Sequence, residues 1–113
     1  MPRDKDSMVD IVDAARLAVS YLGGVSKQTF LDNTQLQDAV IRRLEIIGEA
    51  ARRISPETRE AYAAIAWAEM IGMRNLMIHG YDDIDLEIVW DTVKVDLPGL
   101  IEQLESIVRP ETF

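Results

Sequence analysis

The sequence predicts an all-α protein, an antiparallel bundle of four or five helices in one domain spanning residues 1–113. Three observations favour this fold class. Apolar residues recur every three or four positions along the chain, which is the spacing of amphipathic helices. Helix start and stop residues divide the chain into segments of helical length. A chain with 48% hydrophobic and 28% charged residues is typical of folded proteins, and 113 residues are enough for one core.

The first helix is expected to begin at Ser7, a favourable N-cap residue, and to end at the Gly23–Gly24 pair. A polar connector over Ser26–Asn33 follows. Within it, Phe30 and Leu31 are expected to point into the core because they are its large apolar side chains.

The second helix should be the longest, from Thr34 to Ile54, with Asn33 or Asp32 as its cap. Gly48 lies in its middle, where glycine costs about 1 kcal/mol relative to alanine. Close approach of another helix, from the same chain or from a second one, would account for a glycine there.

Two arginine pairs in this helix, Arg42–Arg43 and Arg52–Arg53, suggest a basic face for nucleic acid. Glu45 and Glu49, however, lie three or four residues from several of these arginines. That spacing favours ion pairs within the helix over a basic binding face.

The second half of the chain carries clear helix boundaries. The run Ser55–Glu57, with proline between serine and glutamate, predicts the start of a short helix over 57–63. The next helix, Trp67–His79, has apolar residues on nearly all sides and is expected to be the most buried. Asp85 should cap a final helix, which Pro98 either kinks or divides.

Composition excludes several function classes. The absence of cysteine rules out disulfides, thiolate catalysis and cysteine-bound metal, and a single histidine leaves too few ligands for a metal site in a bundle. We therefore expect neither a metal nor another cofactor. No apolar run is long enough to span a membrane, and the charged residues 1–6 do not resemble a signal peptide, so a cytoplasmic location is expected.

The net charge of −8 argues at first against nucleic acid as a ligand. Its distribution changes that interpretation, because residues 81–113 carry nine acidic and two basic side chains, whereas residues 36–80 carry six of each. The middle of the chain is therefore neutral and its basic residues are all arginine, which contacts phosphate through two hydrogen bonds. The acidic C-terminal third is a reasonable docking surface for a basic partner.

The segment from Arg74 to Tyr81 contains the only histidine, His79. Judged by local rules, it is an ordinary helix end, with cations in the last turns and Gly80 after them. Five residues rotate about 500° on a straight helix, which leaves Arg74 and His79 about 140° apart. For the two to share a site, either the helix loosens at His79 or a second copy of the chain completes the site.

An arginine and a histidine can together cleave RNA without a metal. The 2′-hydroxyl attacks the adjacent phosphorus, arginine stabilises the charge on the phosphoryl oxygens, and histidine transfers protons near neutral pH. The expected products carry 2′,3′-cyclic phosphate ends. With one histidine per chain, a dimer would supply both a base and an acid.

The whole pattern resembles a HEPN-domain ribonuclease toxin of the HepT type. The residues that carry the resemblance are the stretch Ile46–Ala50, Trp67, Met73–Asn75, His79–Tyr81 and the later Val89–Trp90 and Asp96–Pro98, in that order. The resemblance covers nearly the whole chain, and the combination is more specific than the arginine-to-histidine spacing alone.

This resemblance implies a HEPN-like bundle that acts as a homodimeric, metal-independent endoribonuclease on an RNA substrate. It assigns Arg74 and His79 as the catalytic pair and Asn75 as their supporting polar neighbour. It also implies the toxin role in a toxin–antitoxin system. The antitoxin would be an MntA-type nucleotidyltransferase that adenylylates Tyr81, with which the toxin could form a hetero-oligomer.

A second hypothesis belongs to a different class. The chain could be a catalytically inert helical module that binds and regulates a partner nucleotidyltransferase, a role that the acidic C-terminal third would suit. Co-purification with such a partner, without RNA cleavage and without growth arrest on expression, distinguishes it from the first.

Overall fold

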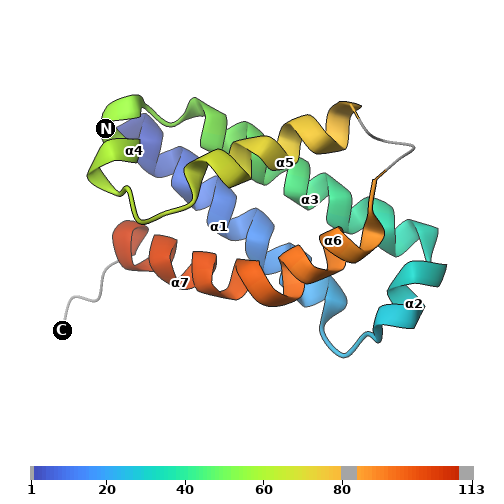
Figure 1. Ribbon diagram of the computed structural model, residues 1–113. Coiled ribbons are helices and arrows are strands. Elements are labelled where there is room, and N and C mark those ends of the chain that lie inside the picture. The colour runs from blue at the N-terminus through green and yellow to red at the C-terminus, as the bar shows by residue number, and fades with distance from the viewer. Residues whose placement is uncertain (1, 80–83, 110–113) are drawn as a thin grey trace.

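The computed structural model describes the backbone of residues 2–79 and 84–109, and the side chains of residues 3–73 and 84–109. Within these ranges the chain is helical and contains no strand, which confirms the all-α prediction (Figure 1). The elements are α1 (Pro2–Leu22), α2 (Lys27–Asp32), α3 (Thr34–Arg53), α4 (Pro56–Ala61), α5 (Trp67–His79), α6 (Leu86–Asp91), the π-helical segment η2 (Thr92–Asp96) and α7 (Leu97–Val108).

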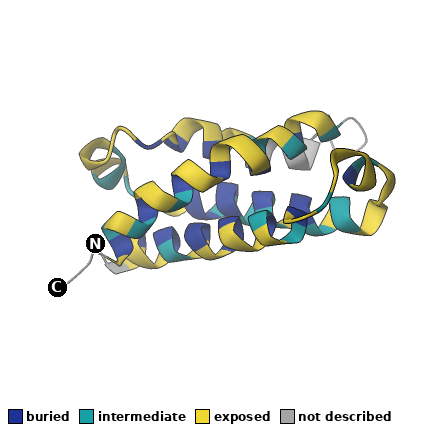
Figure 2. Ribbon diagram, turned by 90° about the horizontal axis from the view of Figure 1, so that it is seen from below, coloured by how far each residue is buried: buried dark blue, intermediate teal, exposed yellow. Residues whose placement is uncertain are grey.

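Helices α1 and α3 form the centre of the bundle and run antiparallel to each other (Figure 1). Helix α5 packs against α3, whereas η2 and α7 pack against α1. The buried positions lie on the sides of the helices that face each other (Figure 2). The largest side chains that are almost fully buried include Ile11, Leu22, Phe30, Leu44, Ile47, Ile54, Met70, Leu97 and Leu104. None of the helices in the described part of the chain is long and apolar enough to cross a membrane.

The prediction that α5 is the most buried helix concerns in part the side chains of residues 74–79, which lie outside the described ones. In its described half, Trp67 and Met70 are buried, but Ala68, Glu69 and Gly72 are exposed. The apolar residues around α5 are partly alanine and glycine, which remove little surface from water wherever they lie. The apolar residues of its described half, 67–73, are therefore buried only on one side.

Helix α1 begins at Pro2, five residues before the predicted start at Ser7. Ser7 lies inside the helix and is buried, with 6% of its surface exposed. The predicted end is confirmed, since the helix stops at Leu22 and Gly24 adopts a φ of 74°, a conformation that favours glycine.

The early start of α1 is explained by Asp4, whose side chain is buried against the start of α4. Its carboxylate accepts hydrogen bonds from the Ser55 backbone N–H at 3.0 Å, the Ser55 hydroxyl at 2.7 Å and the Thr58 hydroxyl at 2.6 Å. Ser55 is also the N-cap of α4, as predicted, and Pro56 is at the first helical position. The first turn of α1 and the first turn of α4 thus stabilise each other.

Replacing Asp4 with asparagine is expected to lower the midpoint of thermal unfolding at pH 7. The hydrogen bonds from Thr58 and Ser55 lower the pKa of Asp4 from its ordinary value, so folding favours the ionised form. This contribution is complete above the unfolded pKa and is lost as the pH falls through the lower folded pKa. The difference between wild type and Asp4→Asn should therefore shrink below about pH 4 in thermal melts. Asp13→Asn, at an exposed position of α1, is the control, and a difference that does not depend on pH would contradict the argument.

Helix α3 agrees closely with its prediction. Asn33 is the N-cap, its side chain accepting from the Leu36 backbone N–H at 3.0 Å, and the helix ends one residue before Ile54. Gly48 is buried, and the helix that carries it packs against both α1 and α5.

The arginines of α3 follow the predicted ion pairing only in part. Arg42 pairs with Glu45 at 3.3 Å and with Glu49 at 3.7 Å within the helix. Arg53 instead reaches Asp10 of α1 at 3.4 Å. These pairs are exposed and contribute little to stability, but they neutralise half of the predicted basic face.

The predicted connector after α1 contains a helix of its own, α2. Ser26 caps it by accepting from the Thr29 backbone N–H, and Phe30 is fully buried, as predicted, with its ring centroid 5.7 Å from that of Trp90. Lys27 binds Glu87 of α6 at 2.6 Å, and this contact raises the pKa of Lys27. Contacts with α6, about sixty residues later, thus stabilise a helix too short to persist alone.

The last helical run passes from α6 through η2 into α7 without a break. Proline in an α-helix clashes with the carbonyl four residues earlier, here that of Lys94. The turn before Pro98 is wider, because the Leu97 backbone N–H donates to the Thr92 carbonyl five residues back. The π-helical turn thus accommodates the proline without interrupting the helical run. The α-helix α7 begins at Leu97, next to Pro98, where the sequence predicts either a kink or the start of a new helix.

Candidate active site

Helix α5 carries three of the four predicted site residues. Its bounds, Trp67–His79, are those predicted from the sequence, and Arg74, Asn75 and His79 lie in its second half. Tyr81, the predicted modification site, lies outside the described residues.

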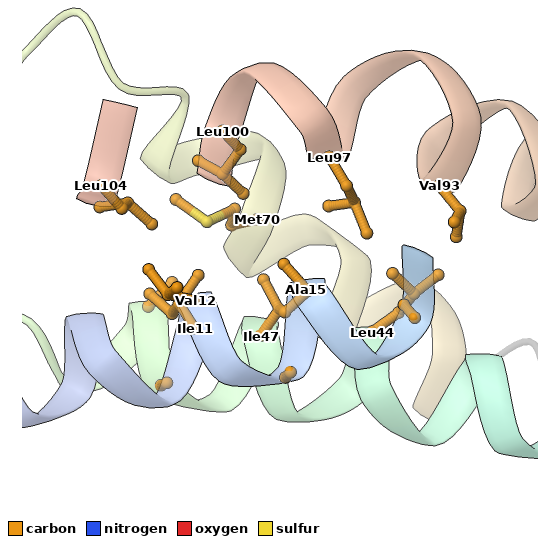
Figure 3. Close-up of a cluster of buried hydrophobic side chains, with 14 of the residues drawn as sticks. Ile11, Val12, Ala15, Leu44, Ile47, Met70, Val93, Leu97, Leu100 and Leu104 are labelled. Atoms are coloured by element: carbon orange, nitrogen blue, oxygen red, sulfur yellow. The ribbon is translucent and has the colours of Figure 1, made fainter. Parts of the chain in front are cut away.

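The start of α5 is fixed by Trp67 and Met70. The Trp67 indole donates from Nε1 to the Tyr62 carbonyl at 3.1 Å, and its ring is buried with 6% exposed. Met70 is 1% exposed, and Figure 3 shows it next to Leu100 of α7, above Val12 of α1. These contacts hold the first half of α5 in place. Because the backbone of the helix continues through residues 74–79, they also set the direction of its second half.

The backbone of α5 remains helical through His79. Positions 74 and 79 are therefore about 140° apart around the helix axis. The prediction left two ways for these positions to share a site, a helix that loosens at His79 or a second copy of the chain. The structure shows a helical backbone as far as His79, and residues 80–83 lie outside the described ones.

After the segment from Arg74 to Tyr81, the next anchored residue that the structure describes is in the cap of α6, at Asp85. This residue is the N-cap of α6, as predicted, and its carboxylate accepts from the backbone N–H groups of Glu87 at 2.9 Å and Ile88 at 3.3 Å. Ile84, just before it, is half-buried against the core. In the sequence, the segment from Arg74 to Tyr81 thus lies between the anchored first half of α5 and the N-cap of α6.

A groove between α5 and α7 was not predicted from the sequence. We call it the α5–α7 groove, and it has a volume of about 460 Å³. Its lining residues are Ala66, Glu69, Met70, Met73, Val95, Asp96, Leu97, Gly99, Leu100 and Gln103. Two features of the sequence hint at this groove. Val95 is an apolar residue that lies off the buried stripe of its helix, and Gly99 is a glycine inside a helix. Among the side chains that the structure describes, no three His, Asp or Glu residues are grouped closely enough to hold a metal ion.

Comparison with known proteins decides the family. The model of the HepT-like family, described as ribonuclease HepT-like, matches residues 11–107. The chain belongs to the HepT-like ribonuclease family. This result confirms the predicted family and, with it, the expected enzyme class of ribonuclease.

Relatives of the HepT-like chain agree with this assignment. A protein of Methanocaldococcus jannaschii named as a presumed RNase is 37% identical over 91% of this chain and 94% of its own length. A protein of Thermococcus cleftensis, named a probable ribonuclease HepT, is 38% identical over the same shares. A longer M. jannaschii protein, whose name joins a gamma-glutamylcyclotransferase to a presumed RNase, is 40% identical over 88% of this chain and 45% of its own length. No solved structure gives a significant match.

Proposed function

We propose that this HepT-like protein is a metal-independent endoribonuclease whose catalytic groups are Arg74 and His79. Membership of a ribonuclease family supports the activity, and the position of both residues on the anchored helix α5 supports the assignment. Arginine would bind the phosphoryl oxygens and stabilise the charge that develops on them. Asn75, the neighbour of Arg74, would support substrate binding through its amide.

The proposed reaction is a transfer within the RNA strand. The 2′-oxygen attacks the adjacent phosphorus while its proton passes to a neutral imidazole. The bond from phosphorus to the 5′-oxygen then breaks, and that oxygen takes a proton from an imidazolium. The products are a 2′,3′-cyclic phosphate and a free 5′-hydroxyl.

A homodimer would supply both of these imidazoles. Each chain has one histidine, and the helical backbone of α5 separates positions 74 and 79 around its axis. A two-fold dimer with the two α5 segments around one cleft would bring an arginine and a histidine from each protomer together. His79 of one protomer then acts as the base and its mate as the acid.

We further propose a toxin role, in the cytoplasm, controlled by an MntA-type nucleotidyltransferase antitoxin. The Tyr81 hydroxyl would attack the α-phosphorus of ATP, releasing pyrophosphate and leaving an adenylate on the tyrosine. Tyr81 is two residues from His79, so the new phosphate would occupy the place of the RNA phosphate. The two proteins could also remain together as a hetero-oligomer.

The test of the proposed activity is incubation of the purified protein with RNA in the presence of EDTA. We expect internal cleavage, with 2′,3′-cyclic phosphate ends that mass spectrometry detects on the fragments. RNA that stays intact with a protein shown to be dimeric would contradict the proposal, as would products ending in 3′-hydroxyls.

The alternative function is that of an inert module that regulates a partner nucleotidyltransferase. The observation that favours it is the acidic C-terminal third, with nine acidic and two basic residues in 81–113. It predicts a stable complex with the partner and changed nucleotidyltransferase activity, without cleavage of RNA by either protein.

A further inference from the structure

The α5–α7 groove is an apolar channel left open on the surface. Its floor is formed by the buried side chains of Met70, Leu97 and Leu100, and the half-buried Met73 forms part of its wall. Val95 lies at its rim with 72% of its surface exposed. Because Met70 and Leu97 are almost fully buried, the apolar surface of the groove that meets water comes mainly from Val95 and the half-buried Met73. An exposed apolar rim above an open groove is typical of a surface that binds another molecule.

Two features of the backbone keep the groove open. Helices α5 and α7 pack mainly on different central helices, α3 and α1, and come together where Met70 lies next to Leu100. Gly99, in the wall formed by α7, has nothing within 4 Å of the position that a Cβ would occupy. Packing within the chain therefore does not require a glycine there, although glycine weakens a helix. The π-helical turn that precedes α7 contains Val95, and such turns are frequent at functional sites.

The charge of the groove indicates what it would bind. Glu69 and Asp96 are the charged residues among its described lining residues, and neither forms an ion pair with a described residue. An apolar floor between two unpaired carboxylates is complementary to an apolar row flanked by cations. RNA would be repelled by these carboxylates. A second copy of this chain that placed its own groove here would bring the same carboxylates, Glu69 and Asp96, close to one another, which is unfavourable.

We propose that the α5–α7 groove is the docking site for an amphipathic helix of a partner protein, one that presents an apolar stripe bordered by lysine or arginine. The apolar stripe covers Val95, Met73 and the exposed edge of Leu100, and Gly99 allows the backbone of the incoming helix to approach closely. The cations pair with Glu69 and Asp96. This proposal does not depend on the ribonuclease mechanism, because it concerns the first half of α5 and the start of α7.

The test is selection of helical peptides on the purified protein. The displayed library contains peptides of about 18 residues, which is five helical turns. The positions on one face of the peptide helix, and those that border this face, are randomised. We expect enriched peptides to be apolar on that face and basic at its borders. Their Kd, measured by fluorescence anisotropy with synthetic labelled peptides, should rise about tenfold or more for Gly99→Leu, which fills the groove, and for the double variant Glu69→Lys with Asp96→Lys.

Matched controls separate docking from folding and from total charge. The double variant Glu60→Lys with Glu102→Lys makes the same charge change at two exposed positions outside the groove, and should leave the Kd within about twofold. Gly99→Leu should unfold at the same temperature as wild type or higher, because leucine is the better helix former. Asp96 makes no capping hydrogen bond, so its replacement should not disturb the start of α7.

Three outcomes would overturn the proposal. The first is that no peptide is enriched, or that enriched peptides lack basic borders. The second is that the double variant Glu60→Lys with Glu102→Lys weakens binding as much as Glu69→Lys with Asp96→Lys, which would indicate attraction by net charge alone. The third is that wild type is a dimer that Gly99→Leu makes monomeric while no peptide binds, which would assign the groove to contacts between copies of this chain.

Discussion

RNA cleavage by the His79→Gln protein is expected to fall by about 10²–10⁴-fold, the contribution of a positioned proton-transfer group. Glutamine keeps the helix and a polar side chain but cannot exchange a proton near neutral pH. Arg74→Ala should cause a loss of about 10²–10³-fold, because it removes stabilisation of the phosphoryl oxygens. Arg74→Lys should be intermediate, since lysine keeps the charge without the two-pronged contact. The measurement is the single-turnover rate on a labelled RNA.

The control for these variants is Arg52→Ala, which removes an exposed arginine of α3. It should change the rate by less than about threefold, because a single phosphate contact outside the site affects binding more than chemistry. Circular dichroism should show the same helix content in all four variants. A His79→Gln rate within threefold of wild type would remove His79 from the mechanism.

Mixing of subunits extends this result to the dimer. Adding excess His79→Gln protein to a fixed amount of wild type should lower the total activity, because most wild-type chains would then share a site that has only one imidazole. If the total activity stays constant while the subunits are shown to exchange, each chain has an independent site.

Incubation with a cognate nucleotidyltransferase and ATP is expected to abolish cleavage, down to the level of the His79→Gln protein. The covalent adenylate adds negative charge and bulk two residues from His79, where the RNA phosphate would bind. Intact mass should increase by one or more adenylate units in step with the loss of activity.

Tyr81→Phe should retain cleavage, gain no mass and resist the nucleotidyltransferase. Tyr62→Phe is the matched control, because Tyr62 is 41% exposed at the end of α4 and far along the sequence from His79. It should be modified and inhibited like wild type. If Tyr81→Phe is inhibited without any gain in mass, control occurs by masking of the site rather than by adenylylation.

Local signals in the sequence were sufficient for elements whose boundaries depend on neighbouring residues. Asn33 caps α3 and Ser55 caps α4 as predicted, because each bonds to a backbone N–H three residues on. The bounds of α5 were likewise predicted. The predicted start of α1 was wrong because Asp4 is bound by Ser55 and Thr58, which lie more than fifty residues away in the sequence. Helix α2 was not predicted because it depends on contacts with α6.

The candidate site shows the same division. The residue types of Arg74 and His79 suggested a chemistry, and their combination with the flanking segments predicted the family. The α5–α7 groove could not be predicted from the sequence. It arises because two helices pack on different partners, and the spacing of residues such as Met70 and Gly99 does not reveal that packing. Pairing between two chains is a further step of the same kind, so the shared site remains a proposal for the experiments above.

The position of α1 between α3 and α7 has a consequence for the timing of folding during synthesis. Helix α1 is made first, but one side of its apolar surface is covered only by η2 and α7, which are made last. Domains generally fold as units while translation adds about 5–20 residues per second. The emerging chain therefore cannot complete its core before its final helix leaves the ribosome. If the protein is a ribonuclease, chains that stop before α7 should therefore have no activity.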